Sequence, residues 1–294
     1  MRTTAKLREL IARSGVLMAP GVADALNAKL VLRHGFEAVY MTGAGTTAVR
    51  LGMPDVGLLT MTEMVDNAAR IADSCGLPVI ADADNGYGGV LNVRRTIQAY
   101  ERAGIAAVHI EDQVMPKRCG HLAGKQLVPA EEMTAKIRAA VDARTDADFV
   151  LIARTDAIAV EGFEAALERA ARYREAGADV LFVEAPSAAE LPRIAPRLKA
   201  PLLYNMATSG KTPFLGKEEI EHLGFKIIIY PNWVMLAAIR AASQVLATLK
   251  ETGTIVGIAA EVPSFKEFFD LLGMSEVQDL EARYGVDANA RVRY

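Results

Sequence analysis

Short apolar segments rich in β-branched residues recur along the chain, and stretches with helical periodicity lie between them. Eight of these segments predict strands, at Val16–Ala19, Ala38–Thr42, Pro78–Ala83, Ala107–Glu111, Phe149–Arg154, Val180–Glu184, Pro201–Asn205 and Lys226–Tyr230. Each of the seven intervals holds a plausible helix. The clearest are expected at Met61–Cys75, Val93–Ala103, Ala130–Arg144, Phe163–Ala176 and Glu218–Leu223, and an eighth follows at Val234–Thr252.

Strands that are apolar on both faces and alternate with helices are typical of a parallel sheet. Eight such units in about 240 residues favour a closed (β/α)8 TIM barrel over an open doubly wound sheet. Gly43-Ala44-Gly45 lacks the third glycine of a dinucleotide-binding fingerprint. Ser264–Tyr284 predicts one or two extra amphipathic helices. We therefore expect one α/β barrel domain over residues 1–294, with residues 253–294 as a C-terminal helical extension.

Composition narrows the class of protein further. The net charge is −3, so no basic field indicates binding to nucleic acid or to anionic lipid. Two cysteines, Cys75 and Cys119, cannot form a disulfide framework, which favours a cytoplasmic location. The first residues do not resemble a signal peptide, and the apolar run Ile227–Ile239 contains Pro231 and is too short to span a bilayer. We expect a cytoplasmic protein with no membrane or nucleic-acid partner.

Polar residues gather where the predicted strands end. The carboxyl ends of parallel barrel strands converge at one opening, called the mouth below, where TIM-barrel chemistry takes place. Asp82, Asp84, Glu111 and Asp112 follow strands three and four. Like charges this close repel unless a cation or a proton neutralises them, and hard carboxylate oxygens favour Mg²⁺ or Mn²⁺ over zinc. The sequence therefore predicts a magnesium site, with helix caps and loop ion pairs as the alternative.

Two further mouth residues allow two interpretations each. Arg154 lies on an apolar strand, where it would bind a substrate carboxylate or form a buried pair with Glu184 or Asp156. His109 is either catalytic or a hydrogen-bonded core histidine. Along an extended chain, Asp82 and Asp84 are expected on the same side.

One cysteine lies in an unusual setting. Cys119 follows Lys117 and Arg118 and precedes Gly120-His121. A thiol ionises more easily beside positive charge, so this loop predicts a thiolate or a readily exchanged proton. Cys75 ends a predicted helix in apolar surroundings, and we expect it to be inert.

These residues resemble the isocitrate lyase and phosphoenolpyruvate mutase superfamily over essentially the whole chain. The matching runs are Tyr40-Met41-Thr42-Gly43, Pro54-Asp55, Asp82-Ala83-Asp84, Glu111-Asp112, Lys117-Arg118-Cys119-Gly120-His121, Arg154-Thr155-Asp156 and Asn205-Met206. The run from Lys117 to His121 is specific for the carbon–carbon lyase branch. The resemblance implies Mg²⁺ held by Asp82 and Asp84, with Asp55 and Glu111 acting through water.

The resemblance also implies roles for other residues. Substrate contacts are expected from Thr42, Gly43, Ala44, Gly120, Arg154, Glu184 and Asn205. The substrate would be a small 2-hydroxy or 2-oxo dicarboxylate. Cys119, assisted by Lys117 and His121, would be the general acid, and Tyr40 the base, with a water on Glu111 as the alternative base. A homotetramer built as a dimer of dimers, with a helix swapped between subunits, is also expected.

The chain departs from methylisocitrate lyases after strand eight. It reads Tyr230-Pro231-Asn232-Trp233-Val234-Met235-Leu236, apolar where those enzymes carry an arginine, and we expect Trp233, Met235 and Leu236 to line the mouth. The pattern is more similar to 2,3-dimethylmalate lyase and carboxyphosphonoenolpyruvate mutase. We therefore expect Mg²⁺-dependent cleavage of a substituted malate to pyruvate and a small carboxylate. The alternatives are oxaloacetate decarboxylase or hydrolase, phosphonate mutase, methylisocitrate lyase, and a silent barrel that binds a 2-oxo acid.

Overall fold

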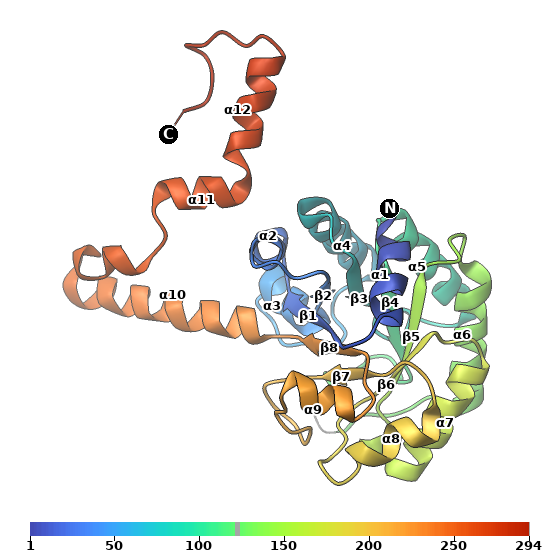
Figure 1. The fold of residues 1–294 in the computed structure, drawn as a ribbon. Helices are drawn as coiled ribbons and strands as arrows, with labels where there is room; N and C mark the ends of the chain where they lie inside the picture. The colour runs from blue at the N-terminus through green and yellow to red at the C-terminus, as the bar shows by residue number, and fades with distance from the viewer. Residues whose placement is uncertain (121–123, 294) are drawn as a thin grey trace. The chain divides into compact units, whose positions relative to one another are not determined.

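Eight parallel strands form one sheet in the computed structural model, which describes residues 1–120 and 124–293. The strands are β1 (Leu17–Val22), β2 (Val39–Met41), β3 (Val79–Asp82), β4 (Ala107–Glu111), β5 (Val150–Thr155), β6 (Val180–Val183), β7 (Leu203–Asn205) and β8 (Ile227–Tyr230). Their spatial order is β6-β5-β4-β3-β2-β1-β8-β7, and a parallel bridge from Leu181 to Leu202 joins the two ends of this order. The sheet thus closes into a barrel surrounded by helices (Figure 1), which confirms the predicted fold.

Helices follow the strands around the barrel. They are α1 (Thr3–Ala12), α2 (Ala25–Arg33), α3 (Gly43–Leu51), α4 (Met61–Cys75), α5 (Val90–Arg102), α6 (Ala130–Ala143), α7 (Phe163–Glu175), α8 (Leu191–Leu198) and α9 (Lys217–His222), with a 3₁₀ turn at Ala157–Ala159. The five clearest predicted helices are confirmed to within three residues at each end. Helix α1, which precedes the first strand, was not predicted.

The strands are apolar on both faces because each face packs on a different core. Ile227 and Ile229 of β8 point into the barrel and belong to one buried cluster, together with Leu7 and Leu10 of α1. Ile228 points outward into a second cluster, which the surrounding helices form with the strands. Helix α1 therefore fills the end of the barrel opposite the mouth, and the inner core leaves only the strand ends free for chemistry.

The chain divides into two compact units, residues 1–235 and 236–294. The C-terminal part contains α10 (Trp233–Thr252), a 3₁₀ segment (Val256–Glu261), α11 (Phe265–Leu272) and α12 (Met274–Arg283). Ser264 and Glu267 form a capping box that starts α11, so the predicted extra helices are confirmed. The predicted single-domain organisation stays a prediction, and the division falls near the start of α10 rather than at residue 253.

The C-terminal helices keep their apolar residues accessible. No residue of α10, α11 or α12 is buried in the described part of this chain, although Leu246 and Phe265 are large and apolar. Within the described residues, no helix has both the length and the apolar character needed to cross a membrane.

Candidate active site

The barrel mouth contains a small polar cavity of about 40 Å³. Its walls come from the ends of β2, β3, β4, β5, β7 and β8 and from the loop after β4. The lining residues are Tyr40, Thr42, Ala44, Asp55, Asp82, Glu111, Lys117, Arg118, Cys119, Gly120, Arg154, Asn205, Pro231 and Asn232. Most of the predicted site residues therefore share one cavity. Ligand pockets are usually about 300–1,000 Å³, so a dicarboxylate can enter only if part of this wall moves.

Two aspartates lie at the end of β3, but not in the way the sequence suggested. The strand ends at Asp82, and Asp84 has a left-handed backbone conformation with φ 47°. The extended-chain alternation that we expected to align the two side chains is therefore wrong here. Asp82 instead accepts hydrogen bonds from the Asp84 amide (2.9 Å) and the Gly43 amide (3.2 Å). A left-handed non-glycine residue is strained, and such strain is concentrated at functional sites.

Gly43 begins α3 directly against Asp82. A Cβ at this position would overlap the Asp82 carboxylate, so the approach requires glycine. The positive end of the α3 dipole then faces a negative charge, which stabilises the carboxylate form of Asp82. Thr42 caps the same helix by accepting from the Gly45 amide, and its hydroxyl donates to Asn232 Oδ1 at 3.2 Å.

Lys117 brings a buried ammonium to these carboxylates. Its Nζ lies 2.7 Å from Asp55 Oδ1 and 2.7 Å from Asp84 Oδ1. The four carboxylates near it, on Asp84, Asp82, Glu111 and Asp55, raise the pKa of Lys117 well above its usual value despite burial. Burial raises the pKa of Asp84 to about 6, with Asp82 and Asp55 adding to the shift and Lys117 opposing it. Lys117 is thus one ammonium beside the three carboxylates of Asp55, Asp82 and Asp84.

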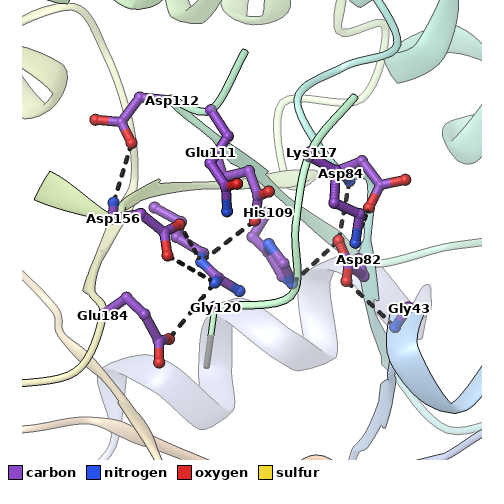
Figure 2. Close-up of polar contacts among 12 residues, drawn as sticks. Gly43, Asp82, Asp84, His109, Glu111, Asp112, Lys117, Gly120, Asp156 and Glu184 are labelled. Atoms are coloured by element: carbon purple, nitrogen blue, oxygen red, sulfur yellow. Dashed lines mark hydrogen bonds and ion pairs between the residues drawn. The ribbon is translucent and has the colours of Figure 1, made fainter. Parts of the chain in front are cut away.

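Arg154 projects from β5 into a ring of carboxylates. Its Nε and Nη2 donate to Asp156 at 2.9 and 3.1 Å, and the guanidinium also lies 3.3 Å from Glu111 and 3.8 Å from Glu184. Asp156, Glu111 and Glu184, which are labelled in Figure 2, are the three carboxylates that form ion pairs with Arg154. The buried pair that the sequence left open is thus present with Asp156. Burial raises the pKa of Glu111 well above its usual value, and Arg154 offsets only part of the shift.

Tyr40 and His109 form a buried hydrogen-bonded pair beside Asp82. The Tyr40 hydroxyl is 2.9 Å from His109 Nε2, and the same nitrogen is 3.6 Å from Asp82 Oδ1. Burial lowers the pKa of His109 to about 4, so the imidazole is neutral at pH 7. Burial and the nearby Asp82 raise the pKa of Tyr40 well above its usual value. His109 therefore does more than fill the core, because it contacts two site residues.

Cys119 and Gly120 lie on the loop that covers the cavity. The Cys119 amide donates to the Asp55 carbonyl at 3.3 Å, and Gln113 holds both the amide and the carbonyl of Arg118. A Cβ on Gly120 would overlap Arg154 Nη2, so only glycine allows the loop backbone to lie on the guanidinium. Lys125, which the sequence did not single out, donates to the Gly120 carbonyl and to Asp156 (2.9 Å). His121 is outside the described residues.

Several predicted residues lie away from the cavity. Asp112 points out of the barrel, because successive strand residues face opposite sides, and it accepts from Thr155 and Tyr173. Trp233 donates to the Met206 carbonyl and lines a groove outside the barrel, so its expected place on the cavity wall is wrong; Pro231 and Asn232 take that place. Cys75 is buried and its thiol donates to Ile71, as expected for an inert cysteine.

Four buried side-chain atoms lack a hydrogen-bond partner among the described residues, and all belong to this site. Three of them, His109 Nδ1, Glu111 Oε1 and Asn205 Oδ1, have no polar contact, and the fourth, Asp84 Oδ1, has only the ion pair with Lys117 at 2.7 Å. Buried polar atoms normally have partners, so this concentration indicates a place for groups from a ligand, an ion or water. No three Asp, Glu, His or Cys side chains converge as a metal-ligand set in the described part of the chain. Mg²⁺ typically uses only one or two protein carboxylates and keeps several waters, so the donors fit it nevertheless.

Comparison with known proteins assigns the family. Residues 7–250 match the family described as phosphoenolpyruvate phosphomutase. The chain belongs to this family. The 2,3-dimethylmalate lyase of Eubacterium barkeri is 47% identical to this family member over 285 residues, which cover 97% of the chain and 99% of the relative. A 2-methylisocitrate lyase of Aeropyrum pernix is 47% identical over 277 residues, 94% of the chain and 89% of the relative.

Solved structures of similar proteins share the fold. A crystal structure of 2,3-dimethylmalate lyase, described as a PEP mutase/isocitrate lyase superfamily member, has a TM-score of 0.94 and 41% identity, covering 100% and 99% of the two chains. A phosphonopyruvate hydrolase complex with oxalate and Mg²⁺ has a TM-score of 0.87 and 32% identity, covering 97% and 99%. The predicted superfamily is therefore confirmed. The similar proteins include carbon–carbon lyases, as the sequence also predicted.

Proposed function

We propose that this protein is a Mg²⁺-dependent lyase that cleaves the C2–C3 bond of a substituted malate, giving pyruvate and a small carboxylate. The observation that carries the proposal is the arrangement of the cavity. The buried carboxylates of Asp82 and Glu111 line it together with Cys119 and Gly120, and Asp84 lies behind them in an ion pair with Lys117. A divalent cation on these carboxylates and a proton donor on the loop would both reach the same small substrate.

Asp82 and Asp84 would hold the metal, with Asp55 and Glu111 reaching it through water. The presence of several carboxylates beside the single ammonium of Lys117 and the unpartnered Glu111 Oε1 support this assignment. When bound, Mg²⁺ (or Mn²⁺) would polarise the C1 carboxylate and the C2 oxygen and stabilise negative charge on that oxygen. Lys117 already supplies one positive charge and would orient Asp55 and Asp84.

Substrate binding would use the opposite half of the cavity. Arg154 uses Nε and Nη2 for Asp156, so its Nη1 would donate to a substrate carboxylate. Asn205 has a buried Oδ1 without a partner. Asn205 donates to Glu184 at 3.1 Å, which fixes the orientation of its amide. Thr42, Gly43, Ala44 and Gly120 would contribute the close-fitting walls, because their small size leaves room for the substrate.

The proton steps would use two separate groups. Tyr40 would accept the proton of the C2 hydroxyl while it passes its own proton to Nε2 of the neutral His109, with a water on Glu111 as the alternative acceptor. The electron pair of the C2–C3 bond then moves to C3 as C2 becomes a carbonyl. Cys119, with Lys117 and His121 nearby in sequence, would deliver a proton to C3. Exclusion of water by the loop would protect the enolate until that transfer.

The wall after β8 favours a small substituent on C3. Pro231 and Asn232 supply this wall, and the cations that line the cavity come from β5 and the loop instead. Burying the third carboxylate of methylisocitrate beside Pro231 would desolvate a charge without a partner. We therefore expect kcat/KM for 2,3-dimethylmalate to exceed that for 2-methylisocitrate by at least about tenfold, the effect of one poorly paired charged contact.

The test is product analysis on three substrates. Purified protein is given 2,3-dimethylmalate, 2-methylisocitrate or oxaloacetate with Mg²⁺, and pyruvate, oxalate and CO₂ are measured. Pyruvate without CO₂ from 2,3-dimethylmalate is the expected result. Oxalate from oxaloacetate would favour a hydrolase, CO₂ would favour a decarboxylase, and binding without turnover would favour a silent barrel.

A cytoplasmic homotetramer with a swapped helix is the accompanying proposal on assembly. An apolar groove of about 510 Å³ lies outside the barrel between β1, β8 and α2, lined by Met18, Leu30, Val31, Phe36 and Tyr230. The apolar residues of α10 lack burial within this chain. A helix from a second copy would cover such a groove. Light scattering of the purified protein should give four times the 31.6 kDa chain mass.

A further inference from the structure

Lys125 is a buried lysine at the far end of the loop that carries Cys119. Only 3% of its side chain is exposed. Its ammonium donates to Asp156 Oδ1 at 2.9 Å and to the Gly120 carbonyl. Burying an ammonium is costly unless it is paired and hydrogen-bonded, so both contacts are needed to hold it there.

Asp156 connects this lysine to the substrate side of the cavity. The same carboxylate receives both Arg154 hydrogen bonds, so Lys125 and Arg154 share one anion. Asp156 is itself fixed from behind, because its amide donates to Asp112 Oδ1 at 3.0 Å. Asp112 in turn accepts from Thr155 and Tyr173 at 2.7 and 2.8 Å. The anion therefore has a defined position that neither cation can shift easily.

Gly120 makes the connection to the loop. Its backbone lies on the Arg154 guanidinium so closely that no Cβ fits, and Figure 2 shows it beside Asp156 and Glu184. Its carbonyl is held by Lys125. The position of the residue next to Cys119 is thus set by the same carboxylate that orients Arg154.

We propose that Lys125 is a positioning residue that couples the Cys119-Gly120 segment to Arg154 through their shared carboxylate, Asp156. The coupling keeps the thiol over the cavity when the loop is in place, and loss of the Lys125 contacts releases the segment. The expected loss of activity rests on the proposed lyase function, whereas the expected change in accessibility of the Cys119 thiol does not.

The test replaces Lys125 with methionine, which keeps the length and removes the charge. Lys136 provides a matched control, because its side chain is also 3% exposed and pairs with Glu132 within α6, away from the cavity. Alkylation of Cys119 by iodoacetamide is followed by mass spectrometry, with the buried Cys75 as internal reference. We expect Lys125→Met to raise the Cys119 rate at least about fivefold, because a segment with fewer hydrogen bonds opens more often.

Steady-state kinetics supply the second readout. Lys125→Met should lower kcat by about tenfold or more, because a small displacement of a catalytic group is enough for such a loss. Lys125→Arg, which can still donate to Asp156, should recover most of the rate. Lys136→Met should match the wild type in both assays. If Lys125→Met does not fold, as judged by circular dichroism, Lys125→Gln replaces it with the same expected direction.

Two outcomes overturn the proposal. One is a folded Lys125 variant whose Cys119 reacts at the wild-type rate. The other is an equal rise in the Lys136→Met control, which would indicate general loosening. If the wild type cleaves none of the substrates, the lyase proposal fails, while the alkylation rates still decide the role of Lys125.

Discussion

Both ends of the barrel carry charged residues, but the two ends differ in how deeply these side chains are buried and how completely they are paired. At the end opposite the mouth, Oδ1 of Asp179 accepts a hydrogen bond from Arg8 at 3.0 Å. Its Oδ2 accepts from Arg144 at 2.7 Å and from the Leu151 amide at 2.8 Å. Both carboxylate oxygens are therefore satisfied, and the three side chains remain partly exposed.

At the mouth, the charges are more deeply buried and less completely paired. Every buried side-chain atom without a hydrogen-bond partner in the described residues belongs to a mouth residue. An unpartnered buried polar group lowers stability, so such groups persist where a ligand or ion uses them. The charged residues opposite the mouth therefore stabilise the fold, whereas those at the mouth are arranged to bind a ligand or an ion.

The largest expected effect comes from removing one mouth carboxylate. Asp84→Ala should lower kcat/KM at least about a thousandfold, because it removes metal charge stabilisation of several kcal/mol. Asp179→Asn should leave kcat/KM within about twofold and instead lower the free energy of unfolding by about 1–3 kcal/mol. Kinetics and urea unfolding of both variants measure these effects. Equal losses of activity in the two variants would erase the distinction between the two ends.

A smaller effect is expected from the two cysteines. Cys119→Ser should reduce kcat by at least about a hundredfold, as for a lost general acid, while 2-oxo acid affinity changes by less than about tenfold. Cys75→Ser should retain the wild-type rate, because its thiol is buried against Ile71 and far in sequence from the mouth loop. Single-turnover rates and calorimetric titration with pyruvate separate chemistry from binding. Comparable damage from Cys75→Ser would contradict the assignment of Cys119.

The smallest effect concerns pH. Burial lowers the pKa of His109 from 6.5 to about 4, so the unfolded chain binds a proton in this interval that the folded chain does not. The His109 contribution to stability is therefore present above pH 6.5 and falls as pH decreases toward 4, by up to about 1.4 kcal/mol per pH unit. Asp84, whose pKa is raised to about 6, acts in the opposite direction below pH 6.

Comparison with His109→Gln isolates this term, because other groups titrate in both proteins. Urea unfolding at several pH values between 7.5 and 5 gives the difference in free energy of unfolding. The wild type should lose stability relative to the variant as the pH falls. A constant difference over this range would mean that His109 is not held neutral by burial.

The barrel could be predicted from the sequence because its strands are apolar on both faces, as for Ile227 to Ile229, and this pattern depends on local composition alone. The position of Asp82 and Glu111 at the mouth was also predictable, because each is the last residue of its strand. The orientation of Asp84 could not be predicted from strand alternation, because the strand ends two residues earlier and Asp84 has a left-handed backbone conformation. The role proposed for Lys125 could not be predicted from the sequence, because it depends on a hydrogen bond to Asp156, which lies 31 residues away in the chain.

Trp233 shows a second limit of the sequence. An apolar residue after a strand can face the cavity or the outside of the barrel, and periodicity does not distinguish them in a single turn. In the structure its indole donates to Met206 and its ring contacts Phe214, which directs it away from the cavity. Pro231 and Asn232 therefore form the wall after β8, and no cation that lines the cavity comes from this segment.

The most direct test of the central claim is Mg²⁺ titration of chelated protein supplied with 2,3-dimethylmalate, with pyruvate release followed continuously. Because the mouth carboxylates are proposed to hold a divalent cation, activity should be absent in EDTA. It should return to a saturating value as free Mg²⁺ rises. Full turnover in EDTA, with metal removal verified by elemental analysis, would contradict the claim.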